Sequence, residues 1–137
     1  MHVNEAAFSR RLMALLRKAM PFVQRIESGT TGRGVPDVYA VYDGREVWLE
    51  LKNIRRSIGS VTTQHIPWRP AQQAWALDYC RAVRGNRCVL TVVAFTDGYG
   101  LVRNNRHYIG NIVPYDDMHR CNDIHELVLA IKYAATT

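Results

Sequence analysis

The stretch VYAVY-DG-REVWL, residues 38–49, decides the fold. Two runs rich in β-branched and aromatic residues are separated only by Asp43-Gly44, and this arrangement is typical of a two-residue β-hairpin. Pairing outward from the turn places Asp37 directly opposite Glu50. The sequence therefore predicts two carboxylates on the same face of a hairpin.

This carboxylate pair needs a neutralising partner. Directly opposed residues on paired strands have Cβ atoms roughly 4.5–5.5 Å apart, and like charges at that distance are destabilising. A divalent cation between Asp37 and Glu50 would remove the repulsion. Lys52 follows Glu50 by two residues, so strand alternation brings its ammonium group to the same face. The pattern indicates a metal site with a lysine at its edge.

A helix over residues 70–84 is expected to complete the site. Pro70 suits a first helical position, and Gly85 suits the end of the helix. An inward stripe at helical spacing comprises Gln72, Trp75, Ala76, Tyr79 and Val83. The stripe turns Gln72 inward and Gln73 outward. An inward glutamine in the first turn is a poor core residue, which favours a role for Gln72 in the site.

These residues resemble a known family. Pro36-Asp37 on one strand, a short hairpin, and Glu50-Leu51-Lys52 on the next strand resemble the PD-(D/E)xK nuclease superfamily. Gly34-Val35 before this motif, and Gln72-x-x-Trp75 after it, are similar to the VRR-NUC (virus-type replication-repair nuclease) branch. The resemblance runs from about residue 5 to residue 93. It implies an α/β fold with a restriction-endonuclease-like core, in which an antiparallel hairpin of a mixed sheet carries the site and helices flank the sheet.

The resemblance also implies a reaction and its groups. It implies Mg²⁺-dependent cleavage of DNA to a 5′-phosphate and a 3′-hydroxyl, with Mn²⁺ as a substitute ion. Asp37, Glu50 and the Leu51 carbonyl would hold one or two ions, because Mg²⁺ prefers hard oxygen ligands. Lys52 would act on the attacking water or the developing charge, and Gln72 would position the water or a phosphate oxygen.

Glu5, on the first helix, is a further candidate. In the family it would help to hold the metal or its waters. Alternatively, Glu5 favours the positive end of the helix dipole in the first turn. The family further suggests branched DNA, such as Holliday junctions or flaps, as the substrate in replication, repair or recombination.

Four arginines are candidate phosphate contacts. Arg33 lies in a glycine-rich loop before the hairpin, and Arg55, Arg56 and Arg69 lie in the long segment after it. Arginines beside an acidic metal site provide phosphate contacts and charge compensation together. Alternatively, these are solvated surface loops. Trp68 could stack on an unpaired base or cover the core.

The remaining chain predicts the rest of an α/β architecture. We expect a helix, a three-stranded antiparallel meander, the crossover helix, a parallel strand buried on both faces, and a C-terminal extension. The further elements expected are a helix at 5–20, strands at 22–27 and 88–95, weak edge strands at 101–102 and 109–113, and a last helix that begins at Asp123.

Composition sets the broad class. The 137 residues have 47% hydrophobic and 22% charged side chains, and we expect one globular domain over residues 1–137. Eighteen Lys plus Arg against twelve Asp plus Glu give a net charge of +6, which suits a polyanionic partner. We find no signal-peptide or membrane-spanning pattern, so we expect no membrane partner and a cytoplasmic protein, in a bacterial cell or a phage-infected host.

Cysteine usage argues against metal or disulfide frameworks. Cys80, Cys88 and Cys121 are an odd set without C-x-x-C spacing, and we expect buried reduced thiols. His119 and His125 flank Cys121, but the spacing matches no standard zinc motif.

Two rival functions stay open at this stage. One is a non-catalytic nucleic-acid-binding module on the same fold, and the other is a structural salt-bridge cluster in a protein without a nucleic-acid role. If the chain is a nuclease for branched DNA, we expect a homodimer, because one constellation provides one cutting centre and a four-way junction takes two symmetric incisions.

Overall fold

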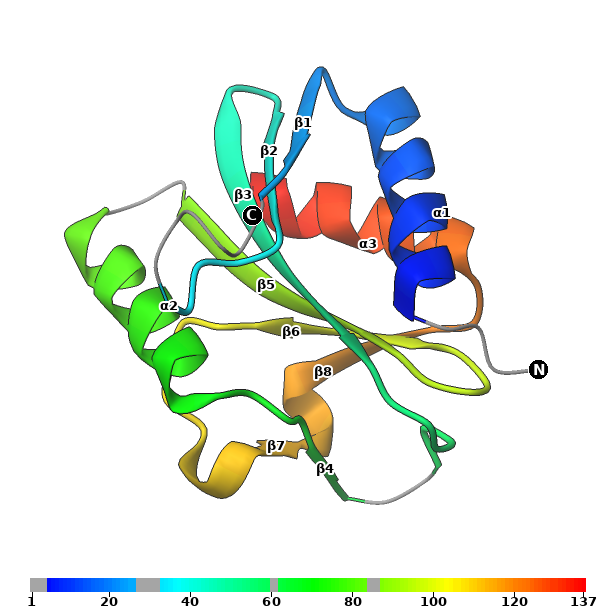
Figure 1. The fold of residues 1–137 in the computed structure, drawn as a ribbon, viewed down its shortest axis with the longest axis vertical. Helices are drawn as coiled ribbons and strands as arrows, with labels where there is room; N and C mark the ends of the chain where they lie inside the picture. The colour runs from blue at the N-terminus through cyan, green and yellow to red at the C-terminus, as the bar shows by residue number, and fades with distance from the viewer. Residues whose placement is uncertain (1–4, 27–32, 60–61, 84–86) are drawn as a thin grey trace.

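A six-stranded mixed sheet with helices on both faces forms the body of the molecule (Figure 1). The computed structural model describes residues 5–26, 33–59, 62–83 and 87–137. The strand order is β1-β2-β3-β5-β6-β8. Helices α1 (Glu5–Ala19) and α3 (Ile124–Thr136) pack on one face, and α2 (Pro70–Ala82) lies on the other. This mixed α/β sheet confirms the predicted fold class.

The predicted meander and its register are confirmed. Strands β1 (Phe22–Arg25), β2 (Val38–Tyr42) and β3 (Arg45–Asn53) are antiparallel neighbours, and Tyr42 pairs with Arg45. Both turn residues have positive φ, 53° at Asp43 and 73° at Gly44, as the two-residue turn that matches strand twist requires. The turn thereby fixes which side chains of β2 and β3 share a face.

The crossover also follows the prediction. Helix α2 leads to β5 (Arg87–Ala94), which lies parallel to β3 and pairs Glu50 with Thr91. The side chains of β5 are buried on both faces from Cys88 onward, as its apolar run predicts. The helix ends at Ala82, slightly earlier than expected, with Val83 as its C-cap; the predicted end at residues 84 and 85 lies outside the described residues.

The C-terminal third corrects two predictions. Strand β6 (Tyr99–Arg103) is not an edge strand, because β8 (Met118–Cys121) pairs with its outer side. The segment expected as a strand at 109–113 begins as a 3-10 turn, η1 (Ile109–Asn111). It continues as β7 (Ile112–Pro114), which pairs with β4 (Thr63–His65) in a separate two-stranded sheet. A second 3-10 turn, η2 (Tyr115–Asp117), connects β7 to β8.

The helices on the α1 face close the main core. Phe8, Leu12 and Leu16 of α1 and the predicted stripe of α3 are buried against the inner face of the sheet. Asp123 caps α3 by accepting a 2.9 Å hydrogen bond from the Glu126 N–H, so the predicted helix start is confirmed. No helix in the described ranges is long and apolar enough to cross a membrane.

The cysteines lie as separate thiols. Cys88 and Cys121 are buried, and burial raises the pKa of each to about 11, so they are protonated near neutral pH. Cys80 is half-buried. His119 and His125 are exposed, so they do not converge on the buried Cys121 thiol.

Candidate active site

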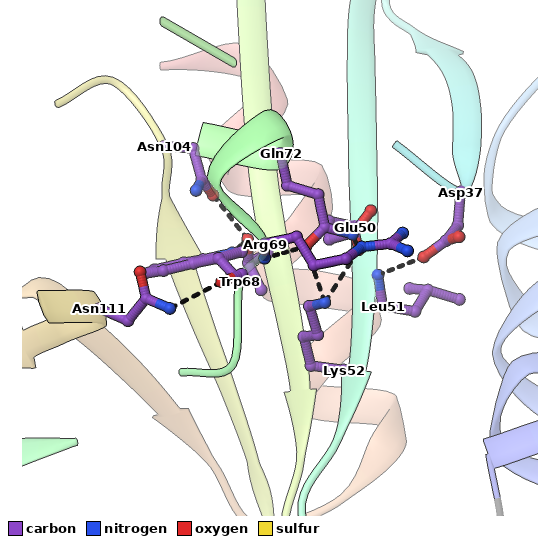
Figure 2. Close-up of polar contacts among 10 residues, drawn as sticks. Asp37, Glu50, Leu51, Lys52, Trp68, Arg69, Gln72, Asn104 and Asn111 are labelled. Atoms are coloured by element: carbon purple, nitrogen blue, oxygen red, sulfur yellow. Dashed lines mark hydrogen bonds and ion pairs between the residues drawn. The ribbon is translucent and has the colours of Figure 1, made fainter. Parts of the chain in front are cut away.

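The two predicted carboxylates lie at the same end of the hairpin. Strand β2 begins one residue after Asp37, and continuing the observed register by one pair places Asp37 opposite Glu50. Asp37 Oδ2 accepts a 2.8 Å hydrogen bond from the Leu51 N–H, which fixes its carboxylate beside β3 (Figure 2). Glu50 is only 6% exposed. Local turn geometry therefore brings a buried carboxylate and a half-buried one together.

Lys52 and Gln72 complete a closed set of contacts around Glu50. Lys52 Nζ lies 3.4 Å from Glu50 Oε2 and donates a 2.8 Å hydrogen bond to Gln72 Oε1. Gln72 Nε2 donates a 2.6 Å hydrogen bond to the same Glu50 oxygen. The three side chains hold one another in a ring, with the lysine and the amide both directed at the carboxylate (Figure 2). Gln72 faces inward, as its place on the helical stripe predicts.

The start of α2 explains the unusual residue at its N-cap. Arg69 stands where serine or threonine is usual, and its side chain makes no capping hydrogen bond. Gln72, three residues later, reaches back to the N-cap, because Gln72 Oε1 accepts a 2.9 Å hydrogen bond from the Arg69 N–H. The exposed Arg69 side chain extends toward Glu50 (Figure 2). The first turn of α2 is thus built around the site.

The electrostatics of Glu50 favour an added cation. Burial and, secondly, the charge of Asp37 raise the pKa of Glu50 to about 7, although Lys52 and Arg69 oppose the shift. A carboxylate that is costly to ionise beside another carboxylate is stabilised by a positive charge between the two. Burial and Asp37 together therefore disfavour the ionised form of Glu50 more strongly than Lys52 and Arg69 favour it.

The donor set fits a hard divalent ion. Among the described residues, the hydrogen bonds of Asp37 and of Glu50 each engage one carboxylate oxygen, which leaves the second oxygen of each as a potential metal ligand. Carboxylate and carbonyl oxygens with retained waters suit Mg²⁺. No group of three or more His, Cys, Asp or Glu side chains converges within the described ranges, so such an ion would need the Leu51 carbonyl and water. The side chain of Glu5, the other predicted ligand, lies outside what the structure describes.

Comparison with known proteins adds evidence on the fold. No protein-family model matches the sequence, and no curated protein matches it. A solved structure of Archaeoglobus fulgidus Hjc, a Holliday junction resolvase from an archaeal hyperthermophile, matches with a TM-score of 0.52. The match covers 88% of this chain and 90% of that chain at 12% sequence identity. The fold is restriction-endonuclease-like.

The four arginines predicted to contact DNA differ in how their side chains are held. Arg33, Arg55 and Arg69 are exposed. Arg56 is also exposed, but its Nη2 donates hydrogen bonds to Gln64 Oε1 at 3.1 Å and to the His65 carbonyl at 2.6 Å. Within the described residues, the hydrogen bonds to β4 distinguish Arg56 from Arg33, Arg55 and Arg69. Residues 28–32 of the predicted glycine-rich loop lie outside the described residues.

Trp68 lies in the core and is not available to stack on a base. It is 5% exposed, its ring stacks on Tyr108 at 5.6 Å, and its indole N–H donates a 2.9 Å hydrogen bond to Thr91 Oγ1. This confirms the interpretation that Trp68 covers the core, rather than the one in which it stacks on an unpaired base.

The prediction that Gln73 faces outward is wrong. Gln73 is 5% exposed and bonds to the backbone of Tyr108 and the side chain of Asn111. The apolar stripe of α2 identifies one buried face, whereas the segment around Tyr108 covers a second face. The sequence does not indicate that Asn111 contacts α2 and its N-terminal end, or that Asn104 is buried against Thr91. The partners of both asparagines lie on other elements, so no local pattern predicts these contacts.

Proposed function

We propose that the protein is a divalent-metal-dependent endonuclease that hydrolyses phosphodiester bonds in DNA. The observation that carries this proposal is the joint placement of Asp37, Glu50, Lys52 and Gln72 at one end of the hairpin. A DNA-binding module has no need for a buried carboxylate whose pKa is raised to about 7. The restriction-endonuclease-like fold agrees with the proposal.

The chain would hold Mg²⁺ through Asp37, Glu50 and the Leu51 carbonyl. The bound ion would lower the pKa of a water and stabilise the charge of the transition state. Glu50 must be ionised to contribute, and the positive charge would favour that form over the protonated one.

Lys52 and Gln72 would act on the reacting groups. Lys52 Nζ has three N–H donors, and Gln72 Oε1 and Glu50 Oε2 account for two of them. The third can reach a water or a phosphate oxygen. Gln72 Nε2 has a second N–H beyond its bond to Glu50, and this donor can orient the same water. Attack of water on phosphorus would break the P–O3′ bond and leave a 5′-phosphate and a 3′-hydroxyl.

Cleavage assays on matched variants test this proposal. Purified protein is incubated with linear, flap and four-way DNA and with Mg²⁺ or Mn²⁺. We expect Asp37→Asn and Glu50→Gln each to abolish cleavage while DNA binding persists. Asp78→Asn makes the same chemical change on the exposed side of α2 and should cleave normally. Full turnover in either site variant would reject the metal site, and binding without cleavage by the wild type would favour a non-catalytic binding module.

We further propose that branched DNA is the preferred substrate and that the working form is a homodimer. One set of site residues per chain makes one incision, and the matched Archaeoglobus protein is described as a Holliday junction resolvase. Mixing wild-type and Glu50→Gln chains tests both points. A dimer predicts that mixed pairs nick a four-way junction on one strand only. A monomeric sedimentation mass together with unchanged paired incision would reject it.

A further inference from the structure

The peptide group between Trp68 and Arg69 is held from both of its ends (Figure 2). Its N–H, on Arg69, donates the 2.9 Å hydrogen bond to Gln72 Oε1. Its carbonyl, on Trp68, accepts a 2.7 Å hydrogen bond from Asn111 Nδ2. Because a peptide group is planar and resists rotation about its C–N bond, fixing the carbonyl also fixes the direction of the N–H. Asn111 and the site glutamine are therefore coupled through one rigid unit.

Backbone contacts determine which way the Asn111 amide points. The Tyr108 N–H donates to Gln73 Oε1 at 2.8 Å, so the other end of the Gln73 amide must be its donor. Gln73 Nε2 donates to the Tyr108 carbonyl at 3.1 Å and to Asn111 Oδ1 at 2.7 Å. Since Asn111 Oδ1 is the acceptor there, Asn111 Nδ2 is left as the donor to Trp68. Gln73 thus sets the orientation of the Asn111 amide, which in turn holds the Trp68–Arg69 peptide.

Asn111 adopts an uncommon backbone conformation at this position. Its φ is 59°, in the left-handed region that few residues other than glycine occupy. Its N–H donates to the Tyr108 carbonyl at 3.0 Å, and its carbonyl accepts from the Ile66 N–H at 2.9 Å. All four polar groups of Asn111 are therefore hydrogen-bonded: its backbone N–H and carbonyl, and its side-chain Oδ1 and Nδ2. An asparagine in the left-handed region that is held by so many contacts indicates a positional requirement.

A second buried contact fixes the same segment to the sheet. The Trp68 indole N–H donates to Thr91 Oγ1, and the Thr91 hydroxyl donates to Asn104 Oδ1 at 2.7 Å. Thr91 is fully buried and is the partner of Glu50 across the parallel β3–β5 pair. The entry to α2 is therefore tied to the strand beside the carboxylate, and Asn111 sets the remaining rotation of the peptide.

We infer that Asn111 is a positioning residue, which orients the Trp68–Arg69 peptide so that the Gln72 amide faces Lys52 and Glu50. Its hydrogen bond begins a continuous series that runs through the peptide and the Gln72 amide to the carboxylate. Such series polarise each member in turn and depend on every link. The catalytic readout of this inference rests on the proposed nuclease function.

Two substitutions separate the contact from the backbone. Asn111→Gly keeps the positive φ without steric cost but removes the amide. Asn111→Asp keeps the acceptor for Gln73 but puts a carboxylate oxygen against the Trp68 carbonyl. We expect Asn111→Gly to lower kcat by about 10- to 100-fold, as small displacements of a positioning group do, with KM changed less than about twofold. Asn111→Asp should be at least as severe. Asn105→Gly, at an exposed asparagine of the same segment, is the matched control and should keep wild-type kcat.

A double-mutant cycle distinguishes positioning from general damage. If Asn111 acts through Gln72, Asn111→Gly should have no further effect on kcat in a Gln72→Ala background. An equal fold-loss in both backgrounds would overturn the inference, because it would place the effect elsewhere. A thermal unfolding curve of each variant shows whether the protein is folded at the assay temperature.

A measurement independent of cleavage keeps the inference testable if the proposed function fails. The ¹⁵N and ¹H shifts of the Gln72 side-chain amide should move in Asn111→Gly and in Asn111→Asp, and should stay in place in Asn105→Gly. Unmoved Gln72 amide signals in both Asn111 variants would overturn the positioning role even if wild-type protein cleaves DNA. If the Gln72 signals move in the Asn111 variants but the wild-type protein cuts no DNA, the positioning role is supported and the nuclease is rejected.

Discussion

Replacing Glu50 with glutamine should stabilise the metal-free protein in a pH-dependent way. Glu50 has a pKa of about 7 in the folded chain, against an ordinary value of 4.5, because burial and Asp37 disfavour its charge. Between these pH values the folded chain holds a proton that the unfolded chain has released. Unfolding is then favoured as pH rises, so wild-type stability is lost from about pH 4.5 to about pH 7.

The size of the effect follows from the two pKa values. At about 1.4 kcal/mol per pH unit, the full difference corresponds to roughly 3 kcal/mol, of which about 2.5 kcal/mol falls between pH 5 and pH 8. Glutamine cannot ionise, and its amide oxygen can still accept the hydrogen bond from Gln72 Nε2. The gain in unfolding free energy from Glu50→Gln should therefore be larger at pH 8 than at pH 5 by about 2 kcal/mol or slightly more.

Urea unfolding at both pH values, with a chelator present, measures this difference. Asp78→Asn on exposed α2 surface controls for loss of a carboxylate as such. Adding Mg²⁺ at ten times its dissociation constant at pH 8 should stabilise the wild type by about 1.4 kcal/mol and leave Glu50→Gln nearly unchanged. An equal effect of Glu50→Gln at pH 5 and pH 8 would refute the reasoning, because it would mean that burial does not disfavour the charge of Glu50.

Three further predictions test the site, its surface and the fold. Lys52→Ala should lower single-turnover cleavage by about 100-fold or more while the Kd for DNA changes little, and normal cleavage with weakened binding would make Lys52 a phosphate contact only. In salt titrations of DNA binding, the Arg33→Ala, Arg55→Ala double variant should make the slope of log K against log salt less steep by about two units. Adding Arg56→Ala should change the slope less, because the Arg56 guanidinium bonds to β4. An unchanged slope in the double variant would place the DNA elsewhere. Asp123→Ala should reduce the free energy of unfolding by about 1 kcal/mol in urea titrations without changing cleavage, and an unchanged midpoint would mean that its cap contributes nothing.

The carboxylates of the site could be predicted because local geometry determines them. A two-residue turn allows one register, so Asp43-Gly44 alone fixes the positions of Asp37 and Glu50 relative to each other. Alternation along β3 then places Lys52. These inferences use contacts between residues within 14 positions of one another in the chain, which short-range patterns describe well.

The C-terminal part of the sheet could not be predicted in the same way. Strand β8 reads MHRC, and only its first and last residues are buried, so it has neither strict alternation nor an apolar run. Without β8, the short Leu101-Val102 run of β6 looked like an edge strand. Whether a strand is internal depends on a partner, and here the partner has no sequence signal of its own.

The two neighbouring glutamines of α2 show where such reasoning stops. Helical periodicity assigned Gln72 correctly because its partners, Glu50 and Lys52, belong to the face that the apolar stripe defines. Gln73 was misassigned because it bonds to Tyr108 and Asn111, which lie 35 and 38 positions later in the chain. Asn111 also holds the peptide that bonds to Gln72. Gln72, which the sequence indicates as a site residue, is therefore oriented by Asn111, which the sequence does not indicate. Chemistry at this site should therefore respond to substitutions in η1 that touch none of the reacting groups, and a search confined to the carboxylate motif would not find them.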